Sequence, residues 1–236
     1  MIAEEQNKAL LIVGNSALNN VEWVNYANYC FEREKGNRKE AFVYLNMFIT
    51  PAQHWSFDDK KAFIEFLFPF FENLPDADYG PFPQPLKEKI VKPALLSWCE
   101  VEKEDNRPFK WFGKYFRNEE YLLKALQIDP ADDSARETLI GWWCYNIYYA
   151  VHHLPDGYIG EPEDDIELSK RIEEQISLLS IKELQIYWAN ELEEDLVFVR
   201  NYIEWRKFGH SNFEQWGQEN NRQTNYRISR AYYYEK

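Results

Sequence analysis

The chain has 236 residues, 45% of them hydrophobic and 28% charged, so it is long enough to bury a sizeable core and has the composition of a globular protein. Its net charge of −13 makes nucleic-acid phosphate an unfavourable partner, and no stretch reaches the roughly 20 apolar residues that a membrane span needs. Only 9 glycines are present, and long runs separate the turn signals, which argues against a many-stranded β protein and favours helices.

Cysteine usage and the N-terminus indicate a cellular compartment. Cys30, Cys99 and Cys144 lie far apart within apolar runs, without zinc-type spacing or a Cys-x-x-Cys pair, so we interpret them as reduced core thiols. The N-terminus lacks a basic segment, and the apolar run 9–13 is too short for a signal peptide. We therefore expect a cytoplasmic protein, and nothing in the pattern calls for a metal or another cofactor.

Apolar spacing and turn residues predict helices along the first half of the chain. The first should stop at Gly14, the third should end before Pro51, and the fourth should kink at Pro69. The expected helices span residues 3–13, from 19 or 20 to 35, 39–49, 57–73 and 85–105. Four prolines between residues 74 and 85 predict a loop there, and we expect the aromatic segment 108–116 to lead into the second half.

The second half begins with a helix that Pro130 stops, followed by a helix that Asp132 or Asp133 caps. This second helix should run to His153, and its aromatic residues go nearly all the way round it, which predicts burial on several sides. Two further helices should follow, one from Glu161 and one over 181–208. Residues 211–236 form either a last short helix, an ordered arm or a frayed tail.

Two of the expected helix pairs carry part of a repeat signature. Segments 23–30 and 36–45 resemble the two helices of a tetratricopeptide repeat, with Ala41 at the small position and Leu45 in place of the usual aromatic. The link between them is two residues longer than in that family. A second partial match covers residues 122–143, where Gly141 stands one residue later than the family's glycine.

Together the two matches span roughly a quarter to a third of the chain. The resemblance implies an irregular stack of helical hairpins with a concave face that binds a peptide or protein. We expect an all-α fold of about eight or nine antiparallel helices, similar to a tetratricopeptide-type solenoid or a helical bundle. It should form a single domain over 1–236, with a candidate hinge at 74–85 and a C-terminal arm, mobile or ordered, over 211–236.

The acidic residues are concentrated in one part of the sequence. Residues 160–195 hold 12 acidic and 3 basic side chains, whereas residues 196–236 hold 4 and 7. Such acidic residues usually form a solvated helix surface. The alternative hypothesis is that they form a docking surface for a basic protein or peptide. Because Trp and Tyr dominate binding hot spots, we include nearby aromatic residues among the candidate binding residues. The candidate partner-binding residues are Tyr158, Glu163, Asp164, Asp165, Glu167, Trp188, Glu191, Glu194 and Asp195.

His152 and His153, beside Asp156 and Glu161, form the most ligand-like cluster. Adjacent side chains on a helix point about 100° apart, so these two histidines should not share a metal ion. We interpret them as imidazoles at a helix C-terminus. No Gly-rich phosphate loop, nucleophile elbow or Cys/His nucleophile pair is present, so we identify no catalytic residue.

The leading hypothesis is a non-catalytic protein–protein interaction module. More sharply, an acidic, aromatic-rich helical protein suits an immunity protein or antitoxin that neutralises a basic nuclease or similar toxin. One alternative is a metal-dependent hydrolase that uses the turn at 152–167, which stoichiometric bound metal would favour. The other is a structural or scaffold subunit, which homo-oligomer formation without another partner would favour.

Overall fold

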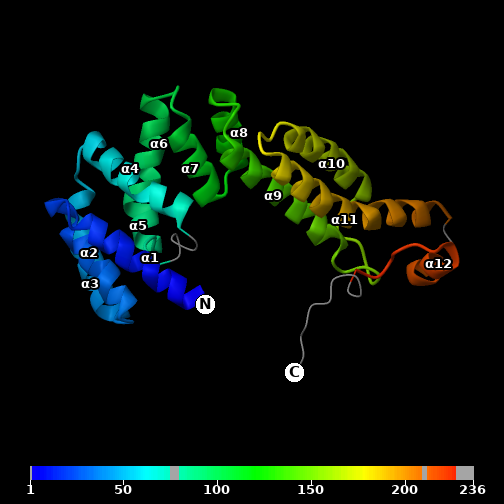
Figure 1. Cartoon of the computed structure of the whole chain (residues 1–236), viewed down its shortest axis with the longest axis horizontal. Helices are drawn as coiled ribbons and strands as arrows, with labels where there is room; N and C mark the ends of the chain where they lie inside the picture. The colour runs from blue at the N-terminus through cyan, green and yellow to red at the C-terminus, as the bar shows by residue number, and fades with distance from the viewer. Residues whose placement is uncertain (1, 75–79, 209–211, 227–236) are drawn as a thin grey trace. The chain divides into compact units, whose positions relative to one another are not determined.

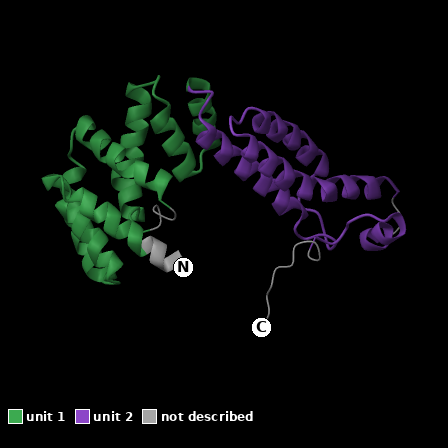
Figure 2. Ribbon diagram, viewed as in Figure 1, with its two compact units in different colours: residues 1–128 green, residues 129–236 purple. Residues whose placement is uncertain are grey.

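The computed structural model describes residues 2–74, 80–208 and 212–226, and every regular element within these ranges is a helix (Figure 1). The predicted all-α class is therefore confirmed. The described ranges contain eleven α-helices of eight residues or more, rather than the eight or nine that we expected. The chain divides into two compact units, which are residues 1–128 (unit 1) and residues 129–236 (unit 2) (Figure 2). The expectation of one continuous domain stays a prediction.

Unit 1 begins with helices that pack in sequence, α1 on α2 and α2 on α3. Its α-helices are α1 (Ile2–Ala17), α2 (Val24–Glu34), α3 (Arg38–Ala52), α4 (Phe57–Asn73), α5 (Gln84–Leu86), α6 (Lys92–Val101), α7 (Asn106–Phe116) and α8 (Glu119–Ile128). The 3-10 turn η1 (Val21–Trp23) precedes α2, and the π turn η2 (Lys87–Val91) precedes α6. Stacked and edge-on aromatic rings, among them Phe63, Phe68 and Trp98, fill the core of this unit.

Several boundaries in unit 1 differ from the expected ones. Helix α1 continues through Gly14, where an added Cβ would lie 2.9 Å from the Phe31 ring, so this glycine permits close packing against α2 and does not end the helix. Helix α3 includes Pro51 in its last turn. The single helix expected over 85–105 is interrupted by the π turn just before Pro93, a residue without the N–H that a regular turn requires.

The segment expected as an aromatic lead-in, residues 108–116, is part of helix α7, which the Asp105 side chain caps by accepting the N–H of Arg107. The end of the proline-rich loop is held in place as well. The hydroxyls of Tyr26 and Tyr29 donate to the carbonyls of Pro81 and Gly80, each over 2.7 Å. Residues 75–79 of the candidate hinge lie outside the described residues.

Unit 2 contains α9 (Asp133–Val151), α10 (Pro162–Ser177), α11 (Lys182–Phe208) and α12 (Phe213–Asn220). Helices α9, α10 and α11 pack pairwise and lie side by side (Figure 1). The Asp133 carboxylate accepts the N–H and the hydroxyl of Ser180, which joins the start of α9 to the turn before α11. The first turns of α9 and α11 therefore lie at the same end of the unit, and the two helices run in the same direction. Helix α10, which lies between them in the sequence, runs in the opposite direction.

Local signals explain the ends of these helices. Asp132 caps α9 by accepting the N–H of Ala135, as predicted. Pro162 stands in the first turn of α10, and three acidic residues follow it at the positive end of the helix dipole. The short helix α12 lies within the expected arm 211–236, whose residues 211 and 227–236 are outside the described residues.

Candidate functional site

The acidic residues at the start of α10 are largely occupied by contacts within unit 2. The hydroxyl of Tyr158 donates to Asp165 Oδ2 over 2.5 Å, and the Tyr158 ring stacks on Tyr202 at 4.8 Å. Burial raises the pKa of the half-buried Asp165 carboxyl above its ordinary value, and burial with the neighbouring carboxylate raises the pKa of the Tyr158 hydroxyl. These two predicted binding residues therefore face each other.

The other α10 acids lie on the surface. Glu163 shares Arg206 of α11 with Glu161, at 3.2 and 3.3 Å, and Glu167 pairs with Lys170 at 2.7 Å. Asp164 is exposed. Exposed ion pairs of this kind contribute little to stability, so these carboxylates can exchange their partners readily.

Three of the four predicted residues on α11 meet α9 around a cavity. This cavity has a volume of about 280 Å³, and its lining combines aromatic side chains with two carboxylates. The lining residues are Gly141, Cys144, Tyr145, Tyr148, Tyr187, Trp188, Glu191 and Asp195. Trp188, Glu191 and Asp195 were predicted from the sequence, and the structure brings them together. The α10 acids do not line this cavity.

Two contacts hold Trp188 in position. Its indole N–H donates to Glu137 Oε1 on α9 over 3.1 Å. Its ring passes directly over Gly141, where an added Cβ would lie 3.2 Å from the ring edge. The late glycine of the second repeat-like match therefore gives space to the tryptophan.

Asp195 is 4% exposed and is one of the residues that line the cavity. Its Oδ1 accepts a hydrogen bond of 2.8 Å from the hydroxyl of Tyr226. The Tyr226 ring packs against Tyr148 and Phe198, so the segment before residue 227 is attached to both α9 and α11. A buried carboxylate needs such a donor, because burial without one is strongly unfavourable.

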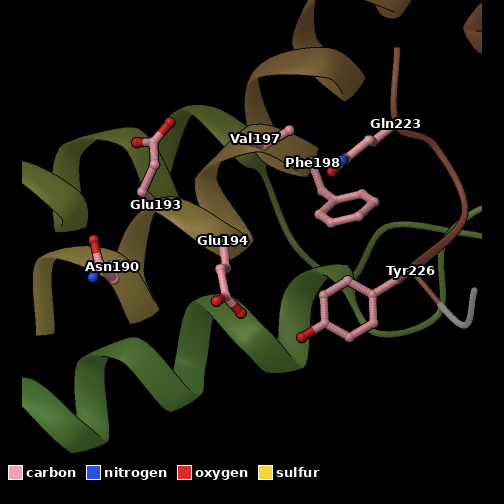
Figure 3. A pocket seen from close by; sticks show the side chains of 7 residues that line it. All are labelled: Asn190, Glu193, Glu194, Val197, Phe198, Gln223 and Tyr226. Carbon is pink, nitrogen blue, oxygen red and sulfur yellow. The ribbon is translucent and has the colours of Figure 1, made fainter. Parts of the chain in front are cut away.

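Tyr226 also borders a second hollow, of about 560 Å³, on the neighbouring side of α11 (Figure 3). Its lining consists of Asn190, Glu193, Glu194, Val197, Phe198, Gln223 and Tyr226. Glu193 is paired with Arg200 of the same helix at 2.6 Å. Glu194, a predicted binding residue, points in Figure 3 toward the same side of the hollow as the Tyr226 hydroxyl. Unit 2 therefore presents two adjacent hollows with acidic linings.

Sequence reasoning missed the tyrosines of α9. Burial on several sides was expected for this helix, but the side chains of Tyr145 and Tyr149 are 57% and 49% exposed. On α11, Tyr187 is 51% exposed and lies edge-on to Trp188 at 5.1 Å. Exposed aromatics clustered beside carboxylates are typical of binding surfaces, and no periodicity in α9 distinguishes them from core residues.

The two histidines lie closer together than helical geometry predicted. Their ring centroids are 4.0 Å apart, and His152 Nδ1 lies 2.7 Å from the carbonyl oxygen of Tyr149. The expected divergence of the two rings is therefore not seen, although His152, the C-cap residue of α9, keeps right-handed helical backbone angles. Within the described part of the chain, no three His, Cys, Asp or Glu side chains gather as a metal site would require.

The electrostatics of the first cavity favour a cation. The pKa of the Cys144 thiol is raised to about 12, chiefly by burial, and the negative field of the Asp195 and Glu191 carboxylates contributes to this shift. Aromatic faces attract cations through their quadrupole, and carboxylates accept their hydrogen bonds. The cavity can therefore hold a cationic group between rings and carboxylates.

Unit 1 has a further cavity, of about 590 Å³, among α6, α7 and α8. Acidic and basic residues alternate around it, including Glu100, Lys103 and Lys124, so its charge selects no particular ligand.

Comparisons with known proteins give no match to this chain among protein-family models, curated proteins or solved structures. None of the helices among the described residues is long and apolar enough to cross a membrane.

Proposed function

We propose that this chain is a non-catalytic protein-binding module and that residues 129–236 dock a basic protein or peptide. The observation that supports this most strongly is the cavity between α9 and α11, where exposed tyrosines stand beside Glu191 and Asp195. The binding face is that of α9 and α11, with the exposed acids of α10 contributing to the surrounding field.

The distribution of charge supports the same function. Residues 129–236 hold 21 acidic and 11 basic side chains, whereas residues 1–128 hold 19 and 16. Most of the net charge of −13 therefore belongs to unit 2. A field of one sign steers a partner of opposite charge and speeds its association, and it is screened over about 10 Å at 0.1 M salt.

The test is affinity capture from the native cell lysate at low salt, with mass spectrometry of the retained proteins. The informative variant replaces Glu163, Glu191 and Glu194 by lysine. Its matched control replaces the exposed Glu22, Glu40 and Glu104 of unit 1 by lysine, which changes the net charge equally. We expect one basic protein at stoichiometric level with the wild type and the control, and its loss with the unit 2 variant. Equal retention by all three proteins would reject docking through these acids.

The more specific form of the proposal is that the partner is a basic nuclease or similar toxin in the cytoplasm, which this chain neutralises as an immunity protein or antitoxin. Such a role requires fast capture and slow release, for which electrostatic steering and buried aromatic contacts are suited. If the captured protein is enzymatically active, one equivalent of this chain should abolish its activity. Retained activity in the saturated complex would reject the immunity role.

We also infer that the helical hairpins are of the tetratricopeptide type. The burial of Ala27 and Ala41, which fall at small positions of the repeat pattern in α2 and α3, supports this inference. A stack of this kind provides a binding surface made from successive hairpins.

A further inference from the structure

We propose that the cavity between α9 and α11 anchors an arginine side chain of the partner. The inference rests on the proposed binding function and deepens it by naming the group that enters the cavity. Its lining, among the described residues, combines four aromatic side chains with the carboxylates of Glu191 and Asp195 and contains no basic residue. Both charged side chains of this lining therefore attract a cation that enters.

The size of the cavity suits one long side chain. At about 280 Å³ it lies at the lower end of the range of ordinary small-molecule sites, roughly 300–1,000 Å³. Tyr145 and Tyr187, at 57% and 51% exposed, stand at its rim and leave it open to solvent. A side chain that projects from a partner's surface can therefore reach these rings from solvent.

Arginine fits this lining better than lysine. A guanidinium group is planar, so it can stack on a tyrosine ring and at the same time donate paired hydrogen bonds to a carboxylate. The same helical bundle already contains such a contact, because the Arg171 guanidinium of α10 lies over the Trp143 ring of α9 at 4.6 Å. An ammonium group is more strongly hydrated and gains less from stacking.

The lining is also held in position before any ligand arrives. Glu137 and Gly141 position Trp188, and the Tyr226 hydroxyl positions Asp195. A preformed site avoids the entropy loss of ordering side chains when the ligand binds.

The experiment measures binding of fluorescein-labelled nona-arginine and nona-lysine to the full chain by fluorescence anisotropy at low salt. The variants are Tyr145→Ala, Tyr145→Phe and Glu191→Gln, with Glu174→Gln as the control. Glu174 is exposed on α10, so its replacement removes the same charge outside the cavity. Thermal unfolding followed by circular dichroism checks that each variant is folded.

We expect the wild type to prefer nona-arginine, and Tyr145→Ala and Glu191→Gln each to weaken its binding by about fivefold or more. Tyr145→Phe keeps the ring and should bind as the wild type does, and Glu174→Gln should change the affinity less than about twofold.

Four results would overturn the assignment. If Glu174→Gln weakens binding as much as Glu191→Gln, or if Tyr145→Ala has no effect, the cavity is not the anchor and only the general field attracts the peptide. If both peptides bind the wild type equally and the cavity variants weaken the binding of both equally, the cavity accepts any cation and the choice of arginine is wrong. If neither peptide binds the wild type at low salt, the proposed docking of basic partners fails together with the anchor.

Discussion

The hydroxyl of Tyr226 donates a hydrogen bond of 2.8 Å to Oδ1 of Asp195, and both residues are buried. Asp195 lines the cavity between α9 and α11, whereas Tyr226 lines the neighbouring hollow, so this hydrogen bond lies where the two meet. It also attaches the chain beyond α12 to the middle of α11. One contact therefore supports both the stability of unit 2 and the shape of its candidate site.

Replacing Tyr226 by phenylalanine should lower the free energy of unfolding by about 1–3 kcal/mol. The ring can keep its packing against Tyr148 and Phe198, but the buried Asp195 carboxylate loses a donor. Urea unfolding measures the change. Tyr145→Phe is the matched control because its side chain is 57% exposed, and it should differ from the wild type by less than about 0.5 kcal/mol. Equal stabilities for the two variants would show that the bond to Asp195 contributes nothing.

Gly113→Ala should destabilise unit 1 although alanine is the better helix former. A Cβ at Gly113 would lie 2.6 Å from Leu122 Cγ and 2.8 Å from the Leu122 backbone nitrogen. Because a backbone atom cannot move aside, α7 and α8 must separate, and we expect a net loss of about 1–3 kcal/mol. The intrinsic helix preference for alanine, about 1 kcal/mol, acts in the opposite direction.

The control for this substitution is Gly157→Ala, since a Cβ at Gly157 would meet no atom within 4 Å. Its stability should change by less than about 1 kcal/mol, with stabilisation favoured because alanine restricts the unfolded chain. Chemical unfolding measures the free energy of unfolding of both variants and of the wild type. A Gly113→Ala protein as stable as the wild type would mean that the contact between α7 and α8 is looser than described.

Asp165→Asn should stabilise the protein at neutral pH. Burial raises the pKa of the Asp165 carboxyl above its ordinary value of 3.8, so the folded state holds its proton more tightly than the unfolded state. The contribution of Asp165 to the stability of the wild type therefore falls as the pH rises from below 3.8 through the folded pKa. Asparagine does not ionise and can still accept the hydrogen bond from Tyr158.

The measurement is the urea midpoint of both proteins between pH 3.5 and pH 7.5. The advantage of Asp165→Asn should grow as the pH rises and shrink toward the acidic end. The control is Asp164→Asn, which removes an exposed charge from the same end of the helix. It measures how the loss of a negative charge near the helix dipole changes stability without any change in burial. A constant difference between wild type and Asp165→Asn across this range would contradict the raised pKa.

Local signals in the sequence were sufficient for much of the fold. The apolar spacing predicted the helical class, and Pro130 with Asp132 predicted the end of one helix and the cap of the next. Gly14 and Pro51 were misleading, because the same residue types also occur inside helices. Gly14 serves close packing against Phe31, and Pro51 occupies the last turn of α3, near the point where the helix ends.

The amino-acid sequence by itself determined the acidity of residues 160–195, the helical class and the grouping of Trp188, Glu191 and Asp195 on one helix. Only the tertiary structure decided which of these face a cavity and which pair with neighbours. Asp165 faces Tyr158, whereas Asp195 faces Tyr226 and the cavity between α9 and α11. It also decided which tyrosines of α9 are exposed. The physical reason is that α9 is aromatic nearly all round, so its buried side is chosen by the helices that pack against it.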